Sequence, residues 1–191
     1  MGILIIKAIG LLLLPLVVFL GGGYLMQKLS DPGQLRDKVQ KEKDLKGLGL
    51  RLEGYKLEAI KEYWGALKLE HGALDAERRM LEIDLVFPFV YGAGFAVALL
   101  LAWAALGRPF HPVWIVTPLF VEVVADWIEN LIQLRQVRLF SGSEGILQPG
   151  WIQIASVATS VKVALFCVSY ILVVGMVVWM IYRNWPRSLA R

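Results

Sequence analysis

The residues of this chain that could do chemistry are polar side chains inside a hydrophobic run, residues 112–134. They are Glu122, Asp126, Glu129 and Asn130. In an α-helix, side chains three, four and seven positions apart share one face, so the three carboxylates form an acidic stripe with the amide beside it. An ionised carboxylate that faces lipid costs about 3 kcal/mol or more, so we expect the stripe to face protein, water or a ligand. The residues expected to face lipid instead are Val121, Val124, Ile128 and Ile132.

Three more polar side chains could reach this stripe from other hydrophobic segments. They are Asp84, Tyr91 and Lys162. Counted at 1.5 Å per residue from the ends of their helices, Asp126 and Lys162 lie at similar depth, so an ion pair is feasible. One interpretation is that Lys162 simply neutralises Asp126 or Glu122, while Glu129 and Asp84 reach water. The other is a polar cavity, which is favoured because three acids on the stripe are more charge than one lysine balances.

The chemistry that this set suits is proton transfer or the binding of a cationic amine, because carboxylates in apolar walls tend to have raised pKa values. The two histidines, His71 and His111, are expected on opposite sides of the membrane, and the spacing of the carboxylates matches no calcium loop. The chain has no H-E-x-x-H, G-x-S-x-G or glycine-rich phosphate-binding motif. Its single cysteine, Cys167, lies in an apolar run and is expected to be a small buried hydrophobe. We therefore expect no metal and no cofactor, and we predict a ligand site of Asp84, Tyr91, Glu122, Asp126, Glu129, Asn130 and Lys162.

The elements that must position these side chains are membrane helices. The chain of 191 residues is 57% hydrophobic and has a mean hydropathy of +0.59, which is too apolar for an ordinary soluble domain. Four of its segments are long enough to cross a hydrocarbon core of about 30 Å. We expect an all-α fold, a four-transmembrane-helix bundle without strands, with spans at residues 3–26, 84–106, 113–134 and 151–182.

A charged segment separates the first two spans and is predicted to be a helical insert outside the bilayer. Its first helix should begin at residues 30–32, where Ser or Asp can cap it, and end near Gly47. A second helix carries an apolar stripe that should pack within the chain, and a break follows at residues 71–72. The stripe consists of Leu57, Ile60, Trp64 and Leu67. The expected organisation is residues 1–26 as the first span, 27–82 as the insert, and 83–191 as a three-helix part with an interfacial C-terminal tail.

Two features of the second span predict how it packs. Pro88 has no N–H, so the carbonyl oxygen of Asp84 is left free, and we expect a bend in a helix that otherwise runs on from the insert. Gly94, Ala98 and Ala102 repeat every fourth residue and form a ridge that another helix can approach closely.

The chain resembles two groups of small membrane proteins. The pattern D-x-x-F-P-x-x-Y at residues 84–91, followed one helix later by D-x-x-E-N at residues 126–130, resembles small four-helix bacterial integral membrane proteins of uncharacterised function. A looser similarity is to the EXPERA group, which includes sterol isomerases and sigma-2-type receptors and implies acids around an amphipathic ligand. The charged insert and the concentration of acids on one helix differ from that group, and no catalytic residue is carried over.

Two functions fit these observations. The first is a non-enzymatic integral membrane protein, either an accessory subunit of a larger membrane complex or a small binding protein whose polar acidic pocket holds an amphipathic small molecule. The alternative is an intramembrane enzyme or carrier that acts on a lipid-like or amine ligand through Glu122, Asp126 and Glu129. The expected partners include the lipid bilayer but no nucleic acid, because the basic residues are scattered among nearly as many acids. We expect the bacterial inner membrane, with the Lys- and Arg-rich insert side in the cytoplasm.

Overall fold

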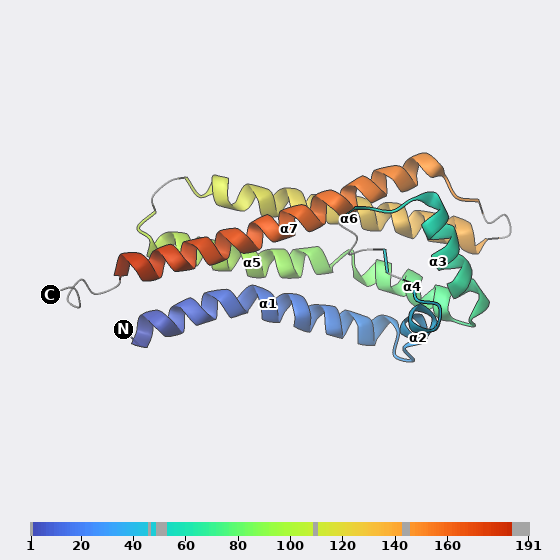
Figure 1. Ribbon diagram of the computed structural model, residues 1–191, viewed down its shortest axis with the longest axis horizontal. Coiled ribbons are helices and arrows are strands. Elements are labelled where there is room, and N and C mark those ends of the chain that lie inside the picture. The colour runs from blue at the N-terminus through green and yellow to red at the C-terminus, as the bar shows by residue number, and fades with distance from the viewer. Residues whose placement is uncertain (1, 46, 49–52, 109–110, 143–145, 185–191) are drawn as a thin grey trace.

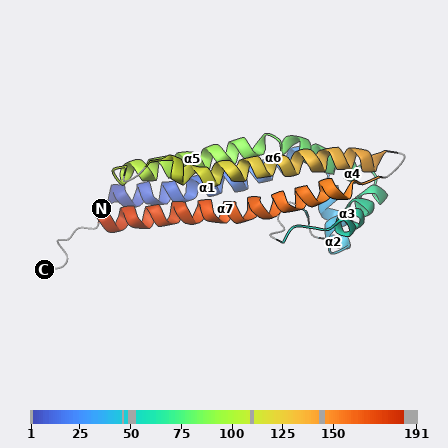
Figure 2. The same cartoon turned by 90° about the horizontal axis from the view of Figure 1, so that it is seen from above.

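The computed structural model describes residues 2–45, 47–48, 53–108, 111–142 and 146–184, and this part of the chain forms seven helices and no strand. Four long helices run side by side, with the start of the first and the end of the last at the same end of the molecule (Figures 1 and 2). They are α1 (Gly2–Ser30), α5 (Phe87–Ala105), α6 (Val113–Ser141) and α7 (Pro149–Asn184). The all-α expectation is therefore confirmed.

Three of these helices contain a segment long and apolar enough to cross a membrane. The segments are Ile5–Ser30, Phe87–Ala105 and Pro149–Arg183. The fourth long helix, α6, lies against both α5 and α7, but its acidic stripe makes it less apolar. The three apolar segments support a membrane protein.

The insert forms three short helices at the end of the bundle opposite to the start of α1 and the end of α7 (Figure 1). They are α2 (Leu35–Glu42), α3 (Leu57–Leu69) and α4 (Ala73–Ile83). The Asp31 carboxylate caps α2, because its two oxygens accept the backbone N–H groups of Leu35 and Arg36, each at 2.8 Å. The predicted stop at Gly47 is wrong, since α2 ends at Glu42.

The predicted apolar stripe of the insert packs within the chain. Ile60, Trp64 and Leu67 are buried, and their cluster includes Val137 of α6 and Ile152 of α7. This packing explains why α6 continues to Ser141, beyond residue 134 where the predicted third span ends. Both α6 and α7 continue beyond the bundle and provide one wall of the core of the insert.

The connection between α4 and α5 is a break rather than the expected bend. α4 ends at Ile83 and α5 begins at Phe87, with Pro88 in its first turn. Two side chains of α6 bind the carbonyl groups that the break leaves free: Asn130 Nδ2 donates to the Asp84 oxygen at 3.1 Å, and Trp127 Nε1 to that of Leu85 at 2.9 Å. Because buried carbonyl groups need partners, these donors allow the chain to leave the helix here.

Another helix approaches the small-residue ridge of α5 closely, as predicted, and at Gly94 that helix is α1. A Cβ atom at Gly94 would lie 3.2 Å from the Val18 Cβ atom, and Ala98 and Ala102 are fully buried.

Two other predictions about exposure of side chains are wrong. Cys167 is exposed on the outer surface of α7 rather than buried, and Ile132 is buried rather than lipid-facing, because it packs into the core of the insert.

Candidate functional site

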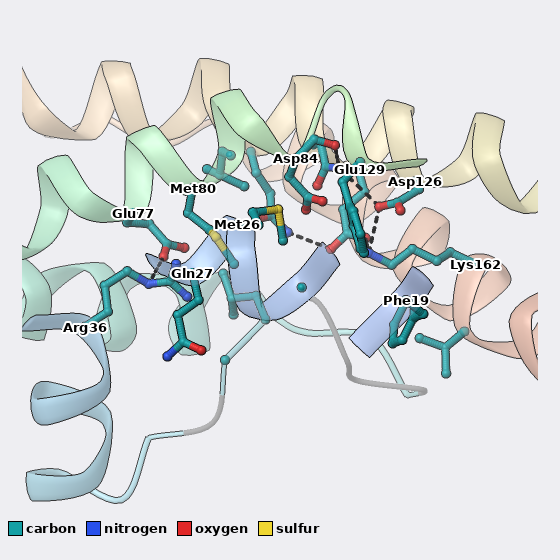
Figure 3. A pocket seen from close by; sticks show the side chains of 18 of the residues that line it. Phe19, Met26, Gln27, Arg36, Glu77, Met80, Asp84, Asp126, Glu129 and Lys162 are labelled. Carbon is teal, nitrogen blue, oxygen red and sulfur yellow. Dashed lines mark hydrogen bonds and ion pairs between the residues drawn. The ribbon is translucent and has the colours of Figure 1, made fainter. Parts of the chain in front are cut away.

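The centre of the site is an ion-paired group of three side chains that joins α7 to α6 (Figure 3). Lys162 Nζ lies 2.9 Å from Asp126 Oδ1 and 2.5 Å from Glu129 Oε2. The carboxylates are three positions apart and share a helix face, so one ammonium group reaches both. The predicted approach of Lys162 to Asp126 is therefore present. Glu129, which only the simple ion-pair interpretation placed in water, is 1% exposed and paired with Lys162, because α7 packs along this face of α6.

Neutral side chains hold the same carboxylates in place. The Tyr91 hydroxyl donates to Asp126 Oδ2 at 2.8 Å, and Asn130 Nδ2 donates to Asp126 Oδ1 at 3.1 Å. Gln133 Nε2 donates to Glu129 Oε1 at 2.8 Å. The Asp126 and Glu129 carboxylates are thus paired and hydrogen-bonded, as buried charges require.

Gln133 is a site residue that the sequence reasoning missed. Its amide also donates to the Tyr55 hydroxyl at 2.8 Å, and the Tyr55 backbone N–H donates to Ser156 Oγ of α7 at 2.8 Å. Burial raises the pKa of the Tyr55 hydroxyl, so this group stays protonated at neutral pH. The available signal was the spacing, because Gln133 lies four residues after Glu129 and continues the polar stripe.

Glu122 differs from the other two carboxylates of the stripe. Its side chain is fully buried, and Lys162 does not pair with it. Ser169 Oγ donates to Oε2 at 3.4 Å, while Oε1 has no hydrogen-bond partner among the described residues. A buried oxygen without a partner costs free energy, of the order of 1–3 kcal/mol for a neutral group and more for a charged one. The expectation that Lys162 neutralises Asp126 or Glu122 thus holds for Asp126 only.

All seven predicted site residues line one pocket of about 960 Å³. Asp84 reaches it from the break between α4 and α5, Tyr91 from α5, and Lys162 from α7. The acids of α6 complete a set of four carboxylates around one ammonium group. This part of the pocket therefore carries an excess of negative charge whenever more than one of the acids is ionised.

The apolar wall of the pocket comes largely from aromatic rings at the side of α1. The centroid of the Phe19 ring lies 4.7 Å from that of Phe166, 5.7 Å from that of Tyr91 and 5.8 Å from that of Phe87. A Cβ atom at Gly22 would collide with the Phe87 ring, so glycine is required for α1 to come this close. Methionine side chains, Met26 of α1 and Met80 of α4, extend the apolar wall towards the insert (Figure 3).

A second polar group lines the same pocket inside the insert, and the sequence reasoning missed it. Arg36 Nε of α2 lies 2.9 Å from Glu77 Oε2 of α4, and the Tyr63 hydroxyl donates to the same oxygen at 3.2 Å. Burial opposes the charge of Arg36, but Glu77, Tyr63 and Asp31 together more than offset this, and the Arg36 pKa lies above its ordinary value. Burial raises the pKa of Tyr63, which therefore remains a donor. No local pattern marks these residues, because the fold of three short helices brings them together.

Metal binding has no geometric support in the described part of the chain, where no three His, Cys, Asp or Glu side chains are grouped to hold an ion. The histidines lie apart from the pocket: His71 follows α3 in the insert, and His111 precedes α6 at the other end of the bundle.

Comparison of the chain with protein-family models, curated proteins and solved structures found no match. The functional argument therefore rests on the geometry of the pocket.

Proposed function

We propose that this chain is an integral membrane protein with four membrane-crossing helices, of which α6 is the fourth. The 29 residues of α6 extend for about 44 Å, more than a hydrocarbon core of about 30 Å. Its carboxylates face inward, and its exposed face is apolar. Exposed residues on that face include Phe120, Val121, Ile128 and Leu131. A helix of this kind can cross the bilayer because its charged side chains contact protein and the pocket rather than lipid.

We further propose that the protein is a small, non-enzymatic binding protein whose pocket holds an amphipathic molecule with a cationic amine. The observation that carries this proposal is the buried Glu122 carboxylate, whose Oε1 has no hydrogen-bond partner among the described residues while Lys162 is already engaged by Asp126 and Glu129. An ammonium group would supply both the missing hydrogen bond and a compensating charge. The aromatic wall around Phe19 suits the hydrocarbon part of such a ligand and can also contact a cation.

The proposed location is the bacterial inner membrane, with the insert on the cytoplasmic side. Basic residues concentrate in the insert, and segments rich in Lys and Arg tend to stay in the cytoplasm. On this assignment, a ligand would reach the carboxylates from the cytoplasmic half of the bilayer. This is where the pocket lies, between the insert and the middle of the bundle.

The binding proposal is tested with a long-chain primary alkylamine and the alcohol of equal length as its uncharged control. The protein is placed in lipid nanodiscs, and empty nanodiscs correct for partition of the probe into lipid. We expect the amine to bind and the alcohol to bind far more weakly. Glu122→Gln should weaken amine binding by about 10-fold or more, the scale of one lost hydrogen bond to a charged group.

The matched control is Glu58→Gln, which removes an exposed carboxylate of α3 and should leave binding unchanged. Equal binding of the amine and the alcohol would contradict the proposal, and so would full affinity in a folded Glu122→Gln variant. If the bound amine is chemically altered or moved across the bilayer, the alternative function is correct instead. That function is an intramembrane enzyme or carrier acting through Glu122, Asp126 and Glu129.

A further inference from the structure

The pocket has two polar ends of different character. Between them lies an apolar neck that consists of the Met26 and Met80 side chains (Figure 3). The inner end, inside the bundle, is formed by the carboxylates and Lys162. The outer end, inside the insert, is formed by Arg36, Glu77 and their neighbours. Met80 of the neck lies about one helical turn after Glu77 and one turn before Asp84, so it separates the two ends along α4. From Glu122 to Gln133 alone, the pocket follows α6 for about 16 Å.

Each end has a buried polar atom without a hydrogen-bond partner among the described residues: an acceptor at the inner end and a donor at the outer end. At the inner end, Glu122 Oε1 is a buried acceptor without a hydrogen-bond partner among the described residues. At the outer end, Arg36 Nη1 is a buried donor that likewise has no hydrogen-bond partner in the described part of the chain. Arg36 already pairs with Glu77 through its Nε atom, so the Nη1 edge of the planar guanidinium remains available for a second acceptor.

The charge at the outer end indicates what kind of acceptor this would be. Glu77 balances the charge of Arg36 at a distance of 2.9 Å. Asp37, which accepts a hydrogen bond from the Gln27 amide, lines the same end and adds negative charge. An anionic group brought beside Arg36 would therefore meet two carboxylates. A neutral oxygen would bind the free N–H without that repulsion.

We infer that the ligand is an elongated amphiphile with polar groups at both ends, bound by its amine at Glu122 and by a neutral acceptor oxygen at Arg36. The acceptor is a hydroxyl, ester or amide oxygen, and the hydrocarbon between the two groups lies against Met26 and Met80. This inference rests on the proposed function and adds the chemistry of the distal end of the ligand. It makes Arg36 a specificity-determining residue.

The test compares primary alkylamines of graded chain length in three forms: unsubstituted, with a terminal hydroxyl, and with a terminal carboxylate. In the wild-type protein, the hydroxylated amine should bind about 10-fold more tightly than the unsubstituted amine once the chain is long enough to join the two ends. Shorter members of the series should show no such gain. The carboxylated amine should bind more weakly than the hydroxylated one.

The variant that isolates the outer end is Arg36→Met combined with Glu77→Gln, which removes the ion pair without leaving one charge buried. It should lose the preference for the hydroxylated amine over the unsubstituted amine. If this variant does not fold, Arg36→Lys serves instead, because it retains the charge beside Glu77 but not the planar fork. It too should lose the preference.

The two proposals fail in different ways. Unsubstituted amine that binds through Glu122 with no gain from the hydroxyl at any chain length would overturn the inference on Arg36 and leave the proposed function standing. A preference for the carboxylated amine, or a hydroxyl preference that survives the loss of Arg36, would also overturn it. Absence of binding by every amine would overturn the proposed function itself.

Discussion

At the scale of single residues, the decisive fact is that one ammonium group is shared by two buried carboxylates. Lys162 contacts both Asp126 and Glu129, while Glu122 is excluded from this pairing. A buried charge is tolerated when it is paired and hydrogen-bonded, and each carboxylate that Lys162 contacts has further donors from Tyr91, Asn130 or Gln133. The pairing thus accounts for two of the acids and leaves Glu122 outside the ion-paired group.

Removal of Lys162 should destabilise the protein more than removal of either of its partners. We expect Lys162→Met to lower the free energy of unfolding by about 3–5 kcal/mol, because two buried carboxylates lose their counter-charge together. Asp126→Asn should cost less, because Glu129 still pairs with the ammonium group. The measurement is reversible unfolding in detergent. Lys61→Met, at an exposed position of α3, is the control and should change stability by less than about 0.5 kcal/mol.

The double variant distinguishes this arrangement from a simple ion pair. In a simple pair, Asp126→Asn combined with Lys162→Met would restore most of the stability lost in the lysine variant. Here Glu129 still lacks its partner, so rescue of stability should be incomplete.

The same variants also test amine binding. We expect Asp126→Asn to retain the fold but lose amine binding, and Lys162→Met in the same chain should not restore that binding. Full rescue of both stability and binding would identify the group as a structural ion pair only.

Tyr91 should contribute to stability through the hydrogen bond of its hydroxyl to Asp126. Tyr91→Phe removes the hydroxyl that donates to Asp126 Oδ2 and leaves the ring packed against Phe87. The expected loss in the free energy of unfolding is about 1.5–3 kcal/mol, the range for a hydrogen bond to a charged group. Tyr182→Phe, at an exposed position near the end of α7, is the control and should have no measurable effect. An unchanged unfolding midpoint in Tyr91→Phe would show that Asp126 does not depend on this donor.

At the scale of elements, α6 contributes to both the bundle and the insert. Its Asn130 side chain binds the free carbonyl oxygen of Asp84, and its residues beyond Leu134 enter the core of the insert. The α4–α5 break therefore depends on a side chain from a helix about forty residues later in the chain. Because Pro88 has no N–H, the Asp84 carbonyl group needs a donor from another element, and Asn130 of α6 supplies it.

Asn130→Leu should consequently loosen the break between α4 and α5. The substitution keeps a similar volume but removes the donor to the Asp84 carbonyl oxygen and to Asp126 Oδ1. We expect a loss of about 1–3 kcal/mol in stability and faster hydrogen exchange around residues 84–86. The neighbouring Leu131→Ala, on the exposed face of α6, should leave exchange there unchanged. Equal exchange in the wild type and Asn130→Leu would contradict this role.

The contact between α1 and α5 depends on Gly94. In Gly94→Val, the new side chain would meet Val18 and force the two helices apart, at a cost of about 1–3 kcal/mol. Gly175→Val is a matched control, because a Cβ atom at Gly175 of α7 meets no atom within 4 Å. Thermal unfolding of the two variants in the same detergent is the measurement. A midpoint for Gly94→Val equal to that of Gly175→Val would show that the close approach has no energetic importance.

At the scale of the whole molecule, the insert lies at one end of the bundle, and the start of α1 and the end of α7 lie at the other (Figure 1). Three helices have the length and hydropathy of membrane spans, and the proposed fourth span, α6, would keep both termini on one side. The residues at the two ends of α6 distinguish a crossing helix from one that lies on a membrane surface. Their accessibility therefore tests both the number of spans and the orientation.

Thiol labelling in a Cys167→Ser background measures that accessibility. If α6 crosses the membrane and the insert is cytoplasmic, Lys41→Cys and Gly142→Cys should react with an impermeant reagent only after the cells are broken. His111→Cys, at the other end of α6, should react in intact cells. The reverse pattern would invert the orientation. Equal reactivity of the residue 111 and 142 variants in intact cells would show that α6 does not cross.

Much of the fold follows from the sequence alone, because helix formation and burial of a polar stripe are local consequences of composition and spacing. The apolar runs predict the long helices, and the positions of Glu122, Asp126 and Glu129 predict which face of α6 points inward. The seven residues predicted to share a site do line one pocket. Their role in binding a ligand is a proposal that the geometry supports.

The tertiary structure decided which side chains from different helices meet, because the spacing of residues along one helix cannot predict this. Lys162 pairs with Asp126 and Glu129 rather than with Glu122 because of how α7 is aligned against α6. The periodicity of one helix does not predict its alignment with another helix. The outer end of the pocket exists because Asp31 fixes the start of α2, which brings Arg36 to Glu77 of α4. The length of α6 was set by burial of Val137 in the insert, a contact between segments far apart in the chain.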